Sequence, residues 1–455
     1  MSDSADAKLR VAIIGSGPAG SYAAGHLLRH TADELHVDLY ERLPTPWGLV
    51  RAGVAPDHPK IKSVTNLYER TAEHPRLRLF ANVEFGRHVT LADLREHYHA
   101  IVYAVGTPVD RAMGIPGEDL AGSYAATDFV GWYNGHPDFR EREFDLRGER
   151  VVVVGAGNVA LDVARMLVLT RAELAVTDIA DHALDVLASS GVREVVVLAR
   201  RGPAQAAFTN PELRELGELS DADVIVDPEE LALGEAIADP DADPTALRNV
   251  EILREYSTRP PAGRSRRVVL RFLLSPLALT GTGRVASLTL ARNELSVGAG
   301  GALRARATDQ RLELPAQAVF RAIGYRGTPL ADVPFDAERE LIANDGGRVR
   351  RGEYVVGWAK RGPSGVIGTN KKDANETIER LLEDLAAGRL LDPVPISDDA
   401  LERFIRERQP ELVDYGDWLT IDRHERGLGE PAGRPRVKLT TVAELLDAIG
   451  WGGDE

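Results

Sequence analysis

The chain contains no cysteine among its 455 residues. This absence excludes disulfide bonds, cysteine nucleophiles, thiolate zinc sites and iron–sulfur clusters held by cysteine. Any redox chemistry must therefore belong to a bound cofactor, and we expect no metal site. Positive charge is also scarce relative to negative charge, because the formal net charge is −15 at pH 7. That balance argues against nucleic-acid binding, which needs a positive surface.

Long apolar runs are absent as well. No apolar stretch reaches the roughly 18 residues that a membrane-spanning helix requires. The first residues, Met1 to Lys8, are polar and do not resemble a signal or transit peptide. We therefore expect a cytoplasmic protein that does not act at a membrane, with a length that suits about two or three domains.

What the chain does contain is a repeated glycine-rich pattern. Residues 11–20 read VAIIGSGPAG, and residues 151–160 read VVVVGAGNVA. In each copy a β-branched run predicts a buried parallel strand, and glycines then turn the chain into a helix whose N–H groups face a pyrophosphate. Two copies predict two dinucleotides, a tightly held flavin and an exchangeable nicotinamide. The predicted contacts of these turns are Gly15, Gly17 and Gly20 in the first, and Ala156 and Gly157 in the second.

The residue that ends the second strand of each pattern distinguishes the two nucleotides. The strand at His36–Tyr40 ends at Glu41, 21 residues after the third glycine, where a carboxylate binds a ribose and repels a 2′-phosphate. The strand at Glu194–Ala199 instead runs into Arg200 and Arg201, whose guanidinium groups suit that phosphate. We therefore expect FAD or NAD at the first site and NADP(H) at the second.

The second pattern is longer than usual, because Arg200 lies 40 residues after Ala160. The periodicity of Thr170–Ser190 predicts an inserted helix that accounts for the extra length. Farther along, Ala236–Asn249 is rich in Asp, Ala and Pro and predicts a surface excursion.

Two similar strands, within Ala100–Thr107 and Ala318–Tyr325, predict the points where the chain crosses between domains. The expected fold is α/β, with two Rossmann-like dinucleotide-binding domains and the NADP domain inserted into a discontinuous FAD domain. The predicted boundaries are 1–108 for the first part of the FAD domain, 109–321 for the NADP domain, and 322–455 for the second part of the FAD domain with a helical tail. In that tail we expect helices at Asp398–Arg408 and Thr441–Ile449.

One run is too particular to be explained by folding, and it reads LPTPWGLVRAGVAPDHPK over residues 43–60. This run resembles the adrenodoxin-reductase family, which includes the bacterial ferredoxin–NADP reductases, and the bacterial branch is the more similar. The resemblance covers nearly the whole chain in order. Further motifs that carry it lie at 157–165, 200–203, 212–216 and 357–372.

The resemblance implies specific contacts. On the FAD side it implies Ala19, Glu41, Leu49, Val83, Trp358, Gly365, Val366 and Ile367. On the NADP(H) side it implies Gly157, Asn158, Val159, Arg200, Arg201 and Glu212. His58 and Glu215 match the family's active-site pair, which positions the substrate and assists proton movement.

The implied function is that of a flavoprotein oxidoreductase, a ferredoxin–NADP⁺ reductase that takes hydride from NADPH onto FAD and passes single electrons to a ferredoxin. Because ferredoxins are acidic, we expect a basic docking patch close to the loop at 362–368. Its residues are Arg348, Arg350, Arg351, Lys360, Arg361, Lys371 and Lys372, opposed within that span only by Glu353. A second cluster comprises Arg264, Arg266 and Arg267.

Two alternatives stay open. A flavin monooxygenase also uses FAD and NADPH, and Phe129–Gly131 with His136 nearly matches its linker motif. A chain that only senses NADPH, with a flavin as structural relic, is the other alternative. An electron-input subunit of the glutamate-synthase type is excluded, because it needs clusters held by cysteine.

Overall fold

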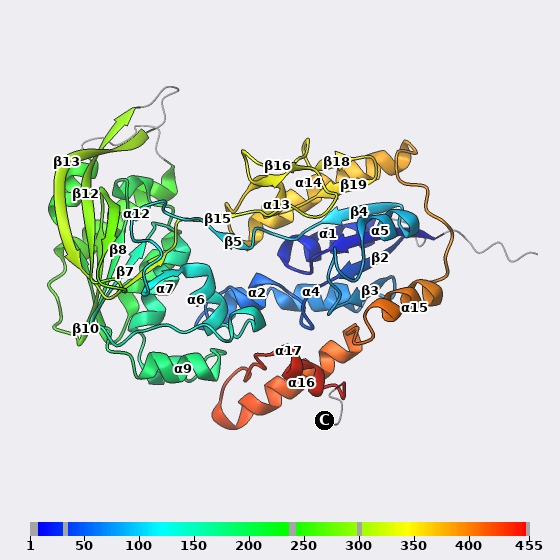
Figure 1. Ribbon diagram of the computed structural model, residues 1–455, viewed down its shortest axis with the longest axis horizontal. Coiled ribbons are helices and arrows are strands. Elements are labelled where there is room, and N and C mark those ends of the chain that lie inside the picture. The colour runs from blue at the N-terminus through cyan, green and yellow to red at the C-terminus, as the bar shows by residue number, and fades with distance from the viewer. Residues whose placement is uncertain (1–7, 31–34, 236–242, 298–302, 452–455) are drawn as a thin grey trace, which may run out of the picture. The chain divides into compact units, whose positions relative to one another are not determined.

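The computed structural model describes residues 8–30, 35–235, 243–297 and 303–451 (Figure 1). The chain divides into two compact units. Unit 1 comprises residues 1–109, 134–137 and 325–455, and unit 2 comprises residues 110–133 and 138–324. Short strands β5 (Val109–Asp110) and β15 (Tyr325–Arg326) lie in the segments where the chain passes from one unit to the other. Within the described ranges no helix has both the length and the apolar character needed to cross a bilayer.

Unit 1 is built on a sheet with the strand order β18-β19-β4-β1-β2-β3. All neighbouring strands are parallel except β18 and β19. The strands are β1 (Leu9–Ile14), β2 (Leu35–Tyr40), β3 (Leu77–Phe80), β4 (Ala100–Tyr103), β18 (Arg348–Arg350) and β19 (Glu353–Val355), and a separate hairpin is formed by β16 (Phe335–Asp336) and β17 (Leu341–Ile342). The helices are α1 (Pro18–His30), α2 (Leu49–Ala52), α3 (Pro59–Lys62), α4 (Thr65–Ala72), α5 (Leu91–His97), α13 (Trp358–Arg361), α14 (Ile367–Ala386), α15 (Asp398–Arg408), α16 (Tyr415–Gly429) and α17 (Val442–Asp447).

The alternation of β1 explains why both faces of this sheet are covered. Val11 and Ile13 point into a core shared with α1, α14, α16 and α17, whereas Ala12 and Ile14 point into a core shared with α5 and α15. A parallel strand with apolar residues at consecutive positions requires such double burial.

Unit 2 has a fully parallel sheet with the order β6-β14-β7-β8-β10-β9. Its strands are β6 (Ser123–Ala125), β7 (Arg150–Val154), β8 (Glu194–Leu198), β9 (Ala222–Val226), β10 (Arg266–Arg271) and β14 (Ala318–Arg321). Helices α6 (Ala126–Tyr133), α7 (Asn158–Val168), α8 (Arg171–Leu174), α9 (Asp181–Ala188), α10 (Asn210–Glu215), α11 (Pro228–Glu235) and α12 (Pro244–Thr258) complete it, with an antiparallel sheet of β11 (Leu274–Thr280), β12 (Ser287–Val297) and β13 (Leu303–Pro315).

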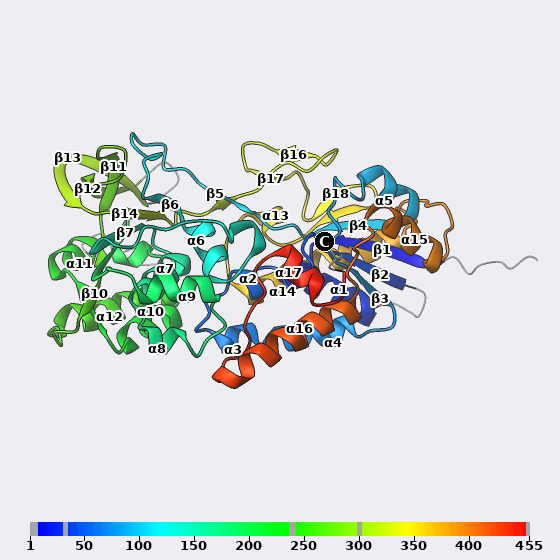
Figure 2. The ribbon, with the colours of Figure 1, turned by 60° about the horizontal axis from the view of Figure 1, so that its bottom comes forward.

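The same alternation covers the unit 2 sheet differently. Val151 and Val153 face a core formed with the helices, whereas Val152 and Val154 face residues of the antiparallel β11–β13 sheet. Figure 2 shows this antiparallel sheet beside β7 and β14. The predicted α/β fold class is therefore confirmed, and the antiparallel layer is an addition that the sequence analysis did not anticipate.

Several local predictions can be compared with these bounds. The insertion at Thr170–Ser190 is helical as predicted, because it holds α8 and α9. In the described part of the predicted surface excursion, residues 243–248 are exposed or half-buried as expected, but they enter helix α12 at Pro244, and Asn249 is fully buried. The buried Asn249 donates from Nδ2 to the Phe208 carbonyl at 2.8 Å, which explains a polar residue in the core. Residues 236–242 lie outside the described residues.

Candidate active site

The first glycine turn leads from β1 into α1 in unit 1. Gly15 has φ +107°, and a Cβ there would lie 2.6 Å from the Ala104 carbonyl oxygen. A Cβ on Gly20 would lie 2.0 Å from the Gly15 oxygen, so only glycine lets the helix pack this closely on the strand. At Gly17 a Cβ would meet nothing nearer than the Gly48 Cα at 3.9 Å. The protein therefore leaves open space beside the Gly17 backbone, which a ligand needs in order to approach it.

Glu41 follows Tyr40, the last residue of β2, and accepts hydrogen bonds from Ser16 of the first turn. The Ser16 hydroxyl donates to Glu41 Oε2 at 2.6 Å, and the Ser16 N–H donates to the same oxygen at 3.2 Å. The other carboxylate oxygen accepts the Leu43 N–H at 3.1 Å. The Val83 N–H donates to the Glu41 carbonyl at 2.9 Å, which brings Val83 beside this strand end. Leu49 lies in α2 with 45% of its surface exposed.

The late segment of unit 1 returns to the first turn. Gly357 has φ +73°, and a Cβ there would lie 2.6 Å from the Cβ of Ala19. The Gly357 N–H donates to Asp373 Oδ2 on α14 at 2.6 Å. Trp358 opens α13, and the loop that ends with Gly365 and Val366 opens α14 at Ile367. The structure therefore brings the predicted residues of the two segments together in one unit.

Three buried polar atoms at this edge of the sheet have no hydrogen-bond partner in the described part of the chain. They are Trp47 Nε1, Thr107 Oγ1 and Trp358 Nε1. The three residues follow β2, β4 and β19, at the carboxyl ends of parallel strands. Ligands bind at that edge in open α/β sheets, and buried polar groups are rarely left unpaired. The residues present therefore fit a bound flavin nucleotide.

The second turn leads from β7 into α7 in unit 2. Gly155 has φ +147°, and a Cβ there would meet the Ala322 carbonyl oxygen at 2.2 Å. By contrast, a Cβ on Gly157 would have nothing within 4 Å. Asn158 Oδ1 accepts the Thr209 N–H at 2.8 Å, which fixes the start of α10 against the start of α7. The Ala156 carbonyl likewise accepts the Ala207 N–H at 2.7 Å.

Arg200 and Arg201 follow β8, the strand next to β7. Among the described residues, no carboxylate forms an ion pair with either guanidinium group. Burial, followed by the like charge of Arg200, lowers the pKa of Arg201. Asn293 donates from Nδ2 to the Arg200 carbonyl at 2.7 Å, so the backbone of the pair is fixed while the side chains stay available. The pair at the carboxyl edge fits an anionic group such as a 2′-phosphate.

A buried arginine joins the two predicted glutamates of unit 2. Arg165 on α7 is 3% exposed, and its Nη2 donates to Asp162 Oδ1 at 2.9 Å. Its Nη1 lies 3.6 Å from a carboxylate oxygen of both Glu212 and Glu215. His58 belongs to unit 1, where it is 7% exposed and caps α3, and its pairing with Glu215 stays a prediction.

Comparisons with known proteins agree with this geometry. The profile of the family described as "Pyridine nucleotide-disulphide oxidoreductase" matches residues 9–203. The chain is 52% identical to "NADPH-ferredoxin reductase FprA" of Mycobacterium leprae, over 97% of this chain and 98% of that protein. It is 42% identical to "NADPH:adrenodoxin oxidoreductase, mitochondrial" of Salvelinus fontinalis, over 96% of this chain and 90% of that protein. A solved structure of Mycobacterium tuberculosis FprA in complex with NADPH superimposes with a TM-score of 0.93 at 51% identity, covering 97% of this chain and 99% of that one.

The chain belongs to the adrenodoxin-reductase-like ferredoxin–NADP reductase family.

Membership in this family confirms the resemblance predicted from the motif at residues 43–60. Within the family fold, the near-match to a monooxygenase linker has a packing explanation. Phe129 is fully buried in α6, and a Cβ on Gly131 would lie 2.2 Å from the Phe139 ring. The pattern Phe-Val-Gly is therefore required by the core of unit 2.

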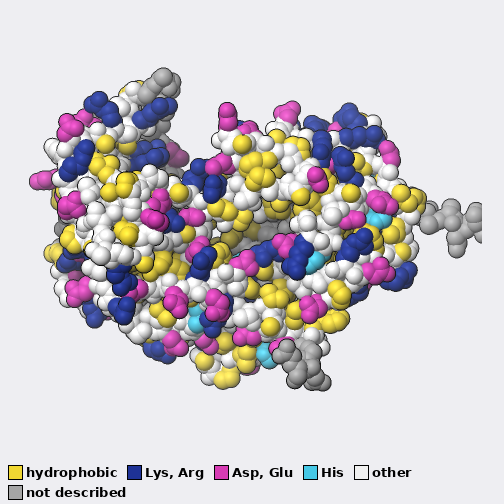
Figure 3. All heavy atoms as spheres, in the orientation of Figure 1, with side chains coloured by type: hydrophobic (Ala, Val, Ile, Leu, Met, Phe, Trp, Pro, Cys, Tyr) yellow, Lys and Arg dark blue, Asp and Glu magenta, His cyan; other side chains and the backbone are white. Residues whose placement is uncertain are grey.

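Most members of the predicted basic docking patch are ion-paired in the structure, and the role of this patch in docking a ferredoxin stays a prediction. The cations are paired with carboxylates that lie mostly outside the 348–372 span, and basic and acidic side chains are mixed across the face shown in Figure 3. The pairs are Arg348 with Asp384 and Glu383, Arg350 with Glu353, Arg351 with Asp392, and Lys360 with Asp373, all at 2.7 to 2.9 Å. Their charges are largely compensated locally.

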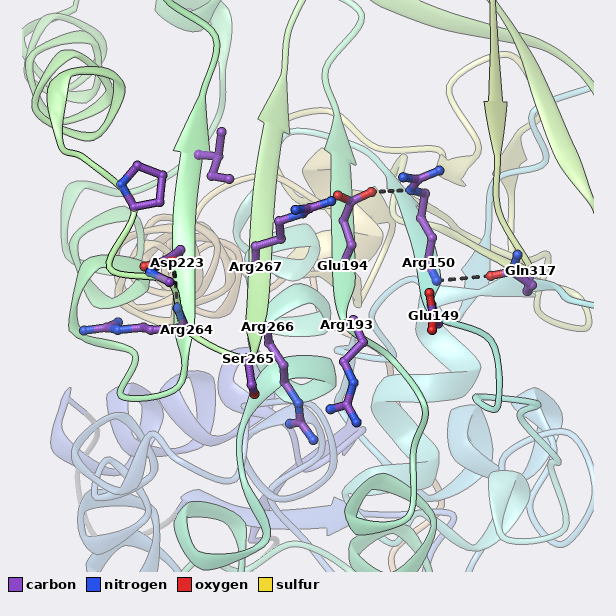
Figure 4. A pocket seen from close by; sticks show the side chains of 13 residues that line it. Glu149, Arg150, Arg193, Glu194, Asp223, Arg264, Ser265, Arg266, Arg267 and Gln317 are labelled. Carbon is purple, nitrogen blue, oxygen red and sulfur yellow. Dashed lines mark hydrogen bonds and ion pairs between the residues drawn. The ribbon is translucent and has the colours of Figure 1, made fainter.

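The second basic cluster lines a pocket of about 460 Å³ in unit 2 (Figure 4). Its walls include the first residues of β7, β8 and β10, which are Arg150, Glu194 and Arg266. Glu194 forms ion pairs with both Arg150 and Arg267. Arg193 and Arg266 point away from these ion pairs. The pocket therefore lies at the amino ends of the strands, opposite the edge that carries Arg200 and Arg201.

Sequence reasoning missed two groups of residues around the candidate sites. Arg165 is the last residue of the motif at 157–165, but nothing at its position in the sequence indicates that it contacts Glu212 and Glu215. The second group is centred on Glu425 in α16, a helix that the sequence analysis did not predict. A buried glutamate whose partner lies 374 positions away leaves no local signal.

Proposed function

We propose that this chain is an FAD-dependent NADPH–ferredoxin reductase in which unit 1 holds FAD and unit 2 holds NADP(H). The observation that carries the proposal is the contrast between the two strand ends. Glu41 places a carboxylate at the first nucleotide site, and Arg200 with Arg201 places at the second two guanidinium groups that form no ion pair with a carboxylate among the described residues. A carboxylate rejects a 2′-phosphate and paired arginines select one.

In unit 1 the residues proposed to hold FAD line the carboxyl edge of the sheet. The turn residues would face the pyrophosphate through the N-terminus of α1, and Glu41 would accept the ribose hydroxyls. The N-terminus of α14 would place backbone N–H groups near the flavin. The full set is Gly15, Gly17, Ala19, Gly20, Glu41, Leu49, Val83, Trp358, Gly365, Val366 and Ile367.

In unit 2 the proposed NADP(H) residues are Ala156, Gly157, Asn158, Val159, Arg200, Arg201 and Glu212. Gly157 offers an open backbone to the pyrophosphate, and the arginines offer charge-assisted hydrogen bonds to the 2′-phosphate. We propose His58 and Glu215 as the pair that orients the nicotinamide and assists proton movement. Arg165 fixes the second of these from the α7 side.

When bound, FAD supplies the ability to accept two electrons from NADPH as hydride and to release them singly to an iron–sulfur protein. The chain supplies alignment and a fixed electrostatic environment rather than a nucleophile, which agrees with its lack of cysteine. The electron acceptor is a ferredoxin. The cytoplasmic location stays a prediction.

A stopped-flow experiment tests this function. The FAD-loaded chain is mixed with NADPH or NADH, and flavin bleaching is followed before ferredoxins of the host are added. We expect fast reduction by NADPH, slower reduction by NADH, and reoxidation by at least one ferredoxin. Reduction without transfer to any ferredoxin would favour the NADPH-sensing alternative. Preparations that bind no flavin would reject the proposal.

A further inference from the structure

The C-terminal tail of unit 1 is hydrogen-bonded to α2, the helix that carries Leu49, one of the proposed FAD contacts. Glu425 on α16 is fully buried. Arg51 on α2 donates to both of its carboxylate oxygens, at 2.8 and 2.5 Å. This bidentate arrangement fixes direction as well as distance. Tyr415 Oη, at the start of α16, donates to the Glu69 carbonyl of α4 at 3.4 Å.

The tail has further points of contact around Arg51. Its guanidinium carbon lies 5.4 Å from the centre of the Trp418 ring, on the same tail helix. Lys438 Nζ donates to the Arg51 carbonyl at 3.1 Å. Tail residues therefore hold both the side chain and the backbone of Arg51. We call this set, Arg51, Trp418, Glu425, Arg436 and Lys438, the tail clamp.

Within the tail clamp, the carboxylate of Glu425 accepts hydrogen bonds from further donors besides Arg51. Arg436 donates to Glu425 Oε2 at 3.0 Å, and the Leu439 N–H donates to Oε1 at 2.9 Å. Burial alone raises the pKa of Glu425, but the charges of Arg51 and Arg436 outweigh burial and leave that pKa lowered. Removing the carboxylate charge would take from buried Arg51 the ion pair described for it, whereas Arg436 would keep Asp422 Oδ1 at 2.7 Å.

From α2 the contact continues into the first glycine turn. Trp47, just before α2, has φ +81°. Residues other than glycine rarely adopt this backbone conformation, and they do so where the surrounding structure enforces it. The Trp47 N–H donates to Ser16 Oγ at 3.3 Å, and the same hydroxyl donates to Glu41. A Cβ on Gly48 would lie 2.9 Å from the Gly17 Cα, so the two backbones touch. A continuous path therefore runs from Glu425 to the proposed FAD contacts.

We infer that Glu425 is a positioning residue for the flavin site, acting through Arg51 to hold α2 and the strained Trp47–Gly48 turn in the conformation that retains FAD. This inference rests on the assignment of FAD to unit 1. It gives the C-terminal tail a role in cofactor retention, whereas the tail otherwise serves as a cover for one face of the sheet.

The test compares three variants of the full chain. Glu425→Gln removes the charge of the clamp while keeping the shape of the side chain. Glu430→Gln changes an exposed glutamate five positions away on the same tail. Asp398→Asn breaks a different attachment of the tail, because Asp398 pairs with Lys8 and Arg10 at 2.7 Å on the far side of the unit. The readouts are the dissociation rate of FAD, followed by flavin fluorescence, and the visible spectrum of bound flavin.

We expect Glu425→Gln to release FAD about 3- to 30-fold faster and to shift the flavin spectrum, as coupling along a packed contact path allows. Both controls should release FAD at the parent rate, although Asp398→Asn lowers thermal stability. Equal release from Glu425→Gln and Glu430→Gln, or equally fast release from Asp398→Asn, would overturn the inference.

A second variant keeps the test decisive if Glu425→Gln does not fold. Arg51→Lys retains the charge but loses the bidentate geometry, and Glu425 keeps Arg436 and the Leu439 N–H as partners. It should also release FAD faster than Glu430→Gln, and parent-like release would count against the clamp. A parent chain that holds no FAD would overturn the proposed function as well, whereas a parent that holds FAD with no difference among variants overturns the clamp alone.

Discussion

The two glycine turns have the same strand–turn–helix backbone, but the charged residues that follow the second strand of each pattern differ in how many partners they have. In unit 1 the strand-end carboxylate, Glu41, is already oriented by three donors from Ser16 and Leu43, with the Ser16 hydroxyl at 2.6 Å. In unit 2 the strand-end guanidinium groups of Arg200 and Arg201 have a fixed backbone and no described carboxylate in an ion pair. The proposed FAD site of unit 1 therefore has an oriented carboxylate without its ligand. The proposed NADP(H) site of unit 2 has guanidinium groups available to bind an anion.

This difference teaches how one fold can serve a retained and an exchangeable nucleotide. A site whose donors and acceptors are already oriented spends little ordering free energy on binding and holds its ligand long. A site that presents unpaired charge attracts an anion from solution and lets it leave when solvent screens the contact. The tail clamp adds to the first site.

The largest expected effect comes from removing the guanidinium charges of Arg200 and Arg201. Replacing Arg200 and Arg201 together with Ala should weaken NADPH binding by about 1.5–3 kcal/mol for each charged contact at most, and NADH binding far less. Titration of the oxidised protein with NADP⁺ and NAD⁺ measures both affinities. Arg193→Ala is the matched control, because Arg193 lines the pocket at the opposite edge. Equal losses for the two nucleotides would show that the arginines do not read the phosphate.

The second-largest effect concerns Glu41, the carboxylate that follows β2 in unit 1. Glu41→Gln keeps the size of the side chain but removes the anionic acceptor, so FAD affinity should fall by about 10- to 100-fold. NADPH affinity should not change, because that site belongs to unit 2. Equilibrium dialysis against FAD checks the first expectation, and Glu73→Gln, an exposed change in the same unit, is the control. A loss of NADPH affinity of the same size would mean that the two ends are not independent.

The sequence predicts the strand ends well, because their chemistry is local. Glu41 and Arg200 each follow a β-branched strand at a position that the glycine pattern dictates, and the structure places both at the carboxyl edge of a sheet. The insertion between Thr170 and Ser190 is predictable for the same reason, since its apolar residues repeat with helical spacing.

What the sequence does not predict depends on partners far along the chain. Arg348 and Arg351 look like free charge in a basic segment, but Asp384 and Asp392 pair with them from positions 36 and 41 residues later. The helix α16 is hidden because glycines at 416, 427 and 429 interrupt its pattern. Its buried Glu425 carries no sign that Arg51 is its partner.

A smaller effect would sharpen the comparison at the backbone itself. A Cβ at Gly157 meets nothing within 4 Å, and a Cβ at Gly17 meets only the Gly48 Cα at 3.9 Å. Gly157→Ala should therefore leave the melting temperature close to that of the parent while lowering NADPH affinity about tenfold. Gly17→Ala should do the same for FAD alone. Gly15→Ala, where a Cβ would lie 2.6 Å from a carbonyl oxygen, should instead destabilise the fold. Unchanged NADPH affinity in Gly157→Ala would remove this backbone from the contact with nucleotide.

The smallest effect separates stability from nucleotide binding. Each unit has a carboxylate shared by two arginines away from the carboxyl ends of its strands: Asp384 with Arg348 and Arg389, and Glu194 with Arg150 and Arg267. Burial raises the pKa of Asp384, but hydrogen bonds from Arg348, Arg389 and Tyr354 outweigh burial and lower it to about 2. A depressed carboxyl pKa contributes stability that is present above the unfolded value of roughly 3.9 and is lost as pH falls through the folded value.

Asp384→Asn should therefore lower the free energy of unfolding by about 1–2 kcal/mol at neutral pH, after allowance for the solvent exposure of both arginines. The difference from the parent should shrink as the pH falls below roughly 4, because the parent carboxylate becomes protonated in the unfolded state. Urea unfolding at a series of pH values measures it, and FAD and NADPH affinities should match those of the parent at neutral pH. A difference that stays constant down to the lowest accessible pH would assign the loss to packing and not to the charge of Asp384.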